Sequence, residues 1–119
     1  MNAVADAPSL TVGGSVVFED DFDGENSGGP TLNYFDFSNW NVSTGSVDLI
    51  GNGFYDAFPG NGLYVDVAGT TGQYGGLTTN VTFAPGTYVI HLDLAGSIYP
   101  GIPGGVSISF GGYSENIVL

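Results

Sequence analysis

The sequence contains no lysine, no arginine and no cysteine among its 119 residues. With 12 Asp and Glu residues and one His, its formal net charge is −12 at pH 7, although only 10% of the residues are charged. A chain without cations cannot displace counterions from phosphates, so we expect no nucleic-acid partner, and anionic membranes are disfavoured for the same reason. The absence of cysteine excludes disulfide frameworks, thiol nucleophiles and thiolate metal sites.

Long apolar runs are also missing, so we expect no insertion into a membrane. The first residues lack the basic start and apolar stretch of a secretory signal, so we expect that this chain carries no signal sequence. The only histidine, His91, has no second His and no Cys to support it as a catalyst or zinc ligand, and we expect it to lie on the surface. No nucleophile has a base at a recognisable spacing. We therefore predict that the protein is not an enzyme.

What the chain does have is many short runs rich in Val, Ile, Tyr, Phe and Thr, separated by 21 glycines and six prolines. Residues 63–67, 88–94 and 106–110 alternate in polarity, which gives each run one dry face and one wet face. Further strands are predicted at 14–22, 39–43, 47–50, 77–83 and 114–119, and an apolar connection at 98–105. Two antiparallel sheets stacked as an all-β sandwich bury these faces economically. We predict one such domain over 14–119, preceded by a linker or N-terminal extension over 1–13.

An acidic segment is the nearest approach to a chemical site in the sequence. Five carboxylates lie within seven residues, and no cation of the chain can neutralise them: Glu19, Asp20, Asp21, Asp23 and Glu25. Because hard oxygen ligands suit calcium, we predict that this segment binds a structural calcium ion, with Asp21, Asp23 and Glu25 as the first candidate ligands. The alternative is a solvated acidic turn that only raises solubility. Three further acids on predicted strands, Asp48, Asp66 and Asp93, are expected to face water; the alternative is that one or two of them belong to a second metal site.

Four aromatic residues are candidates for binding a ligand: Tyr34, Trp40, Tyr55 and Tyr64. An aromatic ring offers an apolar face to the C–H side of a sugar, while Asn and Asp accept hydrogen bonds from its hydroxyls. The alternative is that these rings belong to the core, since 13% aromatic residues suits a small sandwich. The terminal strand at 114–119 suggests a different function, because a strand edge that no turn or charged residue protects can pair with a strand of another chain.

The order and spacing of five short motifs resemble a known group of domains. The motifs are Trp40–Ser43, Gly45–Gly51, Pro59–Val67, Pro85–Tyr88 and Leu92–Gly96. Together they are similar to the galactose-binding-like jelly-roll domains of bacterial secreted proteins, of the PEP-CTERM type and the related DUF642-like type, from about residue 16 to 119. The closing C-terminal strands of that group have no counterpart here, so the resemblance implies an incomplete jelly roll. Residues 2–12 also resemble the linkers of giant RTX-type adhesins.

These resemblances imply an extracellular or cell-surface bacterial module. In the domains of this group, a carboxylate after a Phe near the first strand often helps to bind a structural calcium, and Phe22-Asp23 occupies that place. The implied function is non-catalytic and carbohydrate-binding or adhesive, with a surface glycan or polysaccharide as partner. The alternative is a structural module that assembles with another copy of itself through strand addition at the terminal strand.

Overall fold

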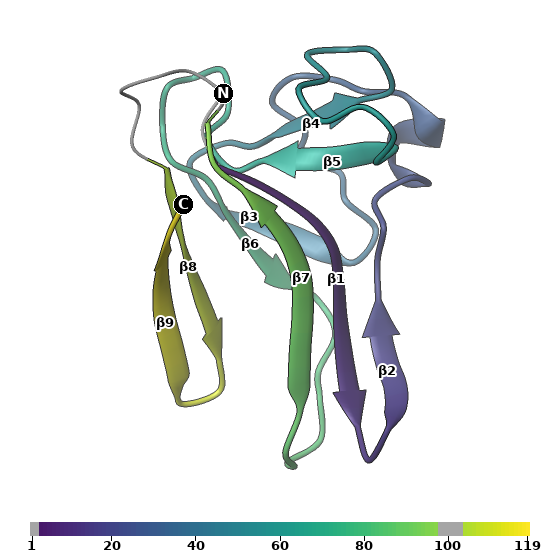
Figure 1. Ribbon diagram of the computed structural model, residues 1–119, viewed down its shortest axis with the longest axis vertical. Coiled ribbons are helices and arrows are strands. Elements are labelled where there is room, and N and C mark those ends of the chain that lie inside the picture. The colour runs from purple at the N-terminus through teal and green to yellow at the C-terminus, as the bar shows by residue number, and fades with distance from the viewer. Residues whose placement is uncertain (1–2, 98–103) are drawn as a thin grey trace.

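The structure, a computed structural model, describes residues 3–97 and 104–119 as an antiparallel β-sandwich (Figure 1). This confirms the predicted fold class. Its elements are β1 (Val4–Val12), β2 (Ser15–Glu19), a short 3-10 helix η1 (Glu25–Gly28), β3 (Trp40–Thr44), β4 (Asp48–Gly51), β5 (Leu63–Asp66), β6 (Gly76–Thr79), β7 (Val89–Ala95), β8 (Gly105–Phe110) and β9 (Tyr113–Val118). In the described ranges, no helix has the length and apolar character that crossing a membrane requires.

The strands form one larger sheet and two strand pairs, all antiparallel. In the larger sheet the order is β2-β1-β5-β4, and β7 also pairs with β1. Figure 1 shows β3 and β6 behind β1 and β7, as a second layer, and the β8–β9 hairpin to one side. The hairpin makes no further strand pairing among the described residues.

The core lies at the β4–β5 end of the sandwich, where both strands are buried on both faces. One face packs against aromatic side chains and the β3–β6 layer, and its cluster comprises Phe22, Tyr34, Phe37, Val47, Leu49, Leu63 and Val65. The opposite face of these strands belongs to a smaller cluster, in which Ile50 and Tyr64 pack with Val4 of β1. Full burial of both faces explains the high share of apolar residues in these short strands.

Residues 4–12, which we predicted as part of a linker, instead form β1, the strand that joins most of the larger sheet. A bulge in β1 explains why the sequence pattern did not predict this strand. Between Asp6 and Ser9 the strand has one more residue than the facing stretch of β7, and Ala7 there takes a positive φ of 45°. The bulge and Pro8 interrupt the alternation of apolar residues, so the sequence pattern does not indicate a strand. Residues 1 and 2 of the predicted linker lie outside the described part of the chain.

The other strand predictions agree with the structure to within a few residues at their ends. The largest differences are β2, which ends at Glu19 rather than at residue 22, and β6, which ends at Thr79 rather than at residue 83. After β2, Phe22 has a φ of 61° and turns the acidic segment away from the sheet. Most of the predicted connection at 98–105, residues 98–103, lies outside the described residues.

Candidate functional site

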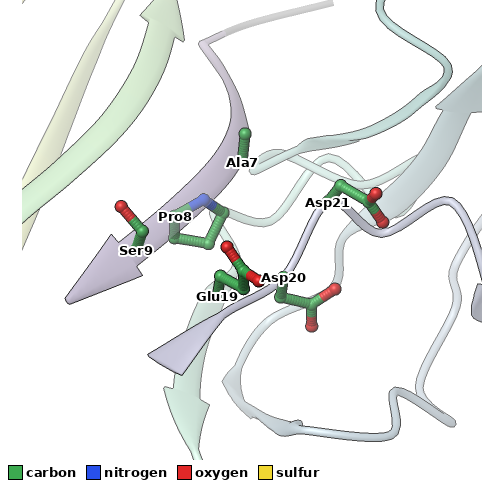
Figure 2. A pocket seen from close by; sticks show the side chains of 6 residues that line it. All are labelled: Ala7, Pro8, Ser9, Glu19, Asp20 and Asp21. Atoms are coloured by element: carbon green, nitrogen blue, oxygen red, sulfur yellow. The ribbon is translucent and has the colours of Figure 1, made fainter. Parts of the chain in front are cut away.

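The acidic segment runs from the end of β2 to η1, beside the bulge of β1. The backbone N–H of Asp20 donates to the carbonyl of Pro8 at 3.1 Å, which fastens the segment to the bulge. A polar pocket of about 450 Å³ lies here, lined by Ala7, Pro8, Ser9, Glu19, Asp20 and Asp21. Figure 2 shows that the Glu19, Asp20 and Asp21 carboxylates point in different directions rather than towards one centre.

Three of the five carboxylates accept hydrogen bonds from distant parts of the chain. Asp20 Oδ2 accepts from the indole Nε1 of Trp40 at 2.9 Å, and from Asn39 Nδ2 at 3.2 Å. Asp23 Oδ1 accepts from the backbone N–H of Leu63 at 2.8 Å, where β5 begins. Glu25, which is buried, accepts from the backbone N–H of Ser38 at 2.8 Å. These acids therefore join the segment to β3, β5 and the loop before β3, with neutral donors in place of absent cations.

The remaining two acids have no such role. Asp21 is exposed, and among the described residues it accepts only from the backbone N–H of Asp23, at 3.0 Å, which closes a local turn. Glu19 is exposed at the end of β2. Within the described residues, no group of three or more acidic or His side chains is placed to hold a metal ion. The calcium site at Glu19, Asp20, Asp21, Asp23 and Glu25 stays a prediction.

A cross-strand pair of acids lies on the outer face of the larger sheet. Asp6 of β1 stands opposite Asp93 of β7 in the antiparallel register, next to the bulge. The pKa of Asp6 is raised from 3.8 to about 6, chiefly by burial and in addition by the charges of Asp23, Asp93 and Asp21, while a hydrogen bond from the N–H of Ala7 acts in the opposite direction. Like charges placed directly opposite each other in a sheet repel. No residue of the chain other than His91 can supply a positive charge there.

Two acids predicted to face water are buried instead. Asp48 of β4 and Asp66 of β5 stand opposite each other in register, and their exposed fractions are 6% and 5%. Asp48 accepts from the N–H of Asn33 at 2.7 Å and from the N–H and hydroxyl of Thr70, and Asp66 accepts from the N–H of Ala68. Burial is tolerated because each carboxylate receives such bonds. Asp93 and His91 are exposed, as predicted.

The four aromatic candidates lie in three different settings. Tyr34 and Tyr64 are buried in the two core clusters, so the prediction that they bind a sugar is corrected: their rings have no exposed face to offer. Trp40 is half-buried, with its ring edge-on to Phe18 at 5.5 Å. Tyr55 is 67% exposed, and it packs edge-on against Phe54 at 4.8 Å. Only this last residue has the exposure that stacking on a sugar requires.

A large apolar groove of about 1470 Å³ lies between the sheets. Its lining includes Ile90, Leu92 and Leu94 of β7, Val106, Ile108 and Phe110 of β8, and Trp40 and Leu77 of the β3–β6 layer. The β7 and β8 side chains are only half-buried. None of the described residues that line the groove is charged, although the chain carries 12 acids.

Aromatic contacts hold the hairpin at this groove. Phe110 of β8 packs against Tyr88 and Phe83 with ring centroids 5.1 and 6.0 Å apart, and Phe83 in turn contacts Phe18 of β2 at 5.7 Å. Strands β7, β8 and β9 each pair with one neighbour only in the part of the chain that the structure describes. Within residues 3–97 and 104–119, the other edge of each of these strands has no strand paired with it.

Comparison with known proteins does not place the chain in a group: no family model, no curated protein and no solved structure matches it. The resemblance to galactose-binding-like jelly-roll domains and to RTX-type linkers stays a prediction. Function must therefore be argued from the geometry of the molecule itself.

The groove is the feature that sequence reasoning missed. The alternation at 88–94 and 106–110 predicted one dry face for each strand, but it did not reveal that these two faces stay half-exposed. No signal in the sequence could have found the groove. The strands β7 and β8 each carry three apolar residues on one face, and only the arrangement of the strands in space leaves these faces half-exposed.

Proposed function

We propose that this chain is a non-catalytic assembly module that binds a strand of another polypeptide by β-strand addition. The observation that carries the proposal is the uncharged apolar groove, bordered by β7 and β8, each of which pairs along one edge only in the part of the chain that the structure describes. An added strand would supply backbone hydrogen bonds to a free edge and place every second side chain in the groove.

The size of the groove supports a polypeptide over a small molecule. Pockets for small ligands usually measure about 300–1,000 Å³, and this groove exceeds that range. Natural sheets usually protect their edges with prolines, bulges or lysines. β7 contains no proline or lysine, and the bulge beside it belongs to β1. These features leave seven regular residues available for pairing.

A synthetic peptide that alternates Val and Thr tests the proposal, because it is uncharged and has one apolar face. We expect it to change the fluorescence of Trp40, the only tryptophan, which lines the groove. Methylating the backbone nitrogens along one edge of the peptide removes several hydrogen bonds of about 1 kcal/mol each, so affinity should fall at least about tenfold. Equal affinity for the methylated peptide would refute strand addition.

A matched pair of variants locates the binding site on the protein. Leu92→Asn places a polar group in the groove and should weaken binding, whereas His91→Asn changes the neighbouring residue on the opposite face and should not. Circular dichroism of both variants checks that the strand still forms. Equal effects of the two substitutions would place the peptide elsewhere.

Sugar binding is the second candidate, and the exposed pair Phe54 and Tyr55 favours it. Their loop also carries Asp56, whose carboxylate is held by the hydroxyl of Tyr64 at 2.9 Å and the N–H of Gly53 at 3.1 Å. Rings beside a fixed carboxylate suit a pyranose. Calorimetric titration with bacterial surface polysaccharides should give heat that Tyr55→Ala removes and Tyr74→Ala, at another exposed ring, retains. Loss of heat in both variants, or in neither, would refute this site.

We also propose that the module acts outside a bacterial cell, as the resemblance to secreted jelly-roll domains implies. Fractionation of the source cells with an antibody against the chain tests this location. Recovery in the cytoplasmic fraction alone would refute it.

A further inference from the structure

We infer that the strand received by this module is a cationic segment, which pairs with the free edge of β7 and sets a Lys or Arg beside Asp93. This inference rests on the strand addition proposed above and deepens it. It names the edge that is used and the chemistry of the partner: apolar residues on the groove side, and positive charge on the outer side.

The edge of β7 suits this role better than those of the hairpin. At seven residues it is the longest strand with a free edge in the described ranges, and it spans about 23 Å. Figure 1 shows β1 along one side of β7 and the β8–β9 hairpin standing apart on the other side, where no described strand pairs with β7. Ile90, Leu92 and Leu94 already line the groove, so a strand added beside them would continue the same apolar face.

The outer face beside this edge carries unbalanced negative charge. Asp93 stands opposite Asp6 in the β1–β7 register, and the charges of Asp21 and Asp23 act on Asp6 as well. A strand paired with β7 places its outer side chains within reach of Asp93, because directly opposite Cβ atoms lie about 4.5–5.5 Å apart. A Lys or Arg in that position would stand next to Asp93 on the side away from Asp6. Its positive charge would attract Asp93 and offset the repulsion between Asp93 and Asp6.

The charge of the whole chain points to the same partner. A net charge of −12 with no lysine or arginine attracts a cationic chain over long distances and speeds its association. A second copy of this chain has no Lys or Arg to offer Asp93 and would bring twelve more carboxylates. Self-assembly through this edge is therefore disfavoured relative to a basic partner.

Three peptides with one alternating pattern test the inference: Val with Lys, Val with Thr, and Val with Glu. In low salt we expect the Lys peptide to bind at least about tenfold more tightly than the Thr peptide, and the Glu peptide to bind most weakly. High salt should reduce this spread. In Asp93→Asn most of the advantage of the Lys peptide should disappear, whereas Asp36→Asn, at an exposed acid in another loop, should preserve it. Hydrogen exchange should show new protection at alternate amides of β7.

The outcomes separate this inference from the proposed function. If all three peptides bind alike but still require their backbone N–H groups, strand addition stands and the cationic partner is refuted. If backbone methylation has no effect, or no peptide binds, both are refuted. If light scattering shows a dimer that none of the peptides displaces, a second copy is the occupant and the inference is wrong. Protection in β8 and β9 instead of β7 would refute the edge.

Discussion

Replacing Asp23 by alanine should lower the stability of the domain markedly, because this carboxylate fastens the start of β5. Its Oδ1 accepts from the backbone N–H of Leu63 at 2.8 Å, and Leu63 is completely buried. Leaving such a donor without an acceptor costs about 1–3 kcal/mol. We expect a loss of about 2 kcal/mol, which in a domain of this size lowers Tm by roughly 6–10 °C.

Two control variants separate this fastening role from calcium binding. Asp23→Asn keeps a carbonyl oxygen that can accept from Leu63, so we expect it to cost at most about 1 kcal/mol. Asp21→Ala removes an exposed carboxylate that closes only a local turn, and it should cost about 0.5 kcal/mol or less. If both acids were calcium ligands, Asn at either position would be as harmful as Ala, since the loss of charge weakens the site.

The assay is urea unfolding, followed by the fluorescence of Trp40, in EDTA and again in millimolar calcium. The hydrogen bond to Leu63 does not depend on a metal, so the ranking Asp23→Ala, then Asp23→Asn, then Asp21→Ala should be the same in both buffers. The argument would be refuted if the loss in Asp23→Ala vanished in EDTA, or if Asp23→Asn unfolded as easily as Asp23→Ala.

Three further predictions concern the same region. Gly62→Ala should lower the free energy of unfolding in urea by about 2–4 kcal/mol, because Gly62 has a φ of 64° and a Cβ there would lie 2.0 Å from Asp23 Oδ1. The control Gly60→Ala, at a φ of 94° with nothing within 4 Å of the added Cβ, should cost only the backbone strain of about 1–2 kcal/mol. Equal losses in the two variants would contradict the close contact at Gly62. Asp6→Asn should stabilise the domain above pH 6: with the pKa of Asp6 at about 6 when folded and 3.8 when unfolded, the native state loses stability as pH rises through that interval. The full penalty is about 3 kcal/mol, and screening of this partly exposed group reduces it to about 1–2 kcal/mol. Urea titrations across pH should show this gain shrinking towards pH 4, and a gain independent of pH would refute it. The predicted calcium site at residues 19–25 should give a rise in Tm that is specific to calcium; an equal rise with calcium and magnesium, from screening alone, would refute it.

Much of the fold could be predicted because its signals are local. The runs at 63–67, 88–94 and 106–110 alternate with the period of a strand, and the structure has β5, β7 and β8 there. β1 escaped prediction because the bulge at Ala7 and Pro8 breaks this period. Its role in the larger sheet comes from pairing with β5 and β7, which are distant in sequence, as well as with β2, which follows it directly.

For the candidate sites, residue type alone was a poor guide to role. Counted along the chain, the five carboxylates of the acidic segment predict the ligands of a calcium ion. In the structure, Asp20, Asp23 and Glu25 accept hydrogen bonds from Trp40, Leu63 and Ser38, and only folding brings these donors near. Likewise the buried Tyr34 cannot be told from the exposed Tyr55 by sequence, because both lie in segments rich in aromatic and turn residues.

The sequence by itself determined the class of the fold and the net charge of the chain. Period-two alternation, abundant glycine and the absence of Lys and Arg are properties that no tertiary arrangement can alter. Only the tertiary structure decided which apolar faces were covered. Those of β4 and β5 meet aromatic side chains and are buried, whereas those of β7 and β8 meet across the groove and stay half-exposed. The physical reason is that burial depends on what lies opposite a face, and strands that face each other are far apart in the chain.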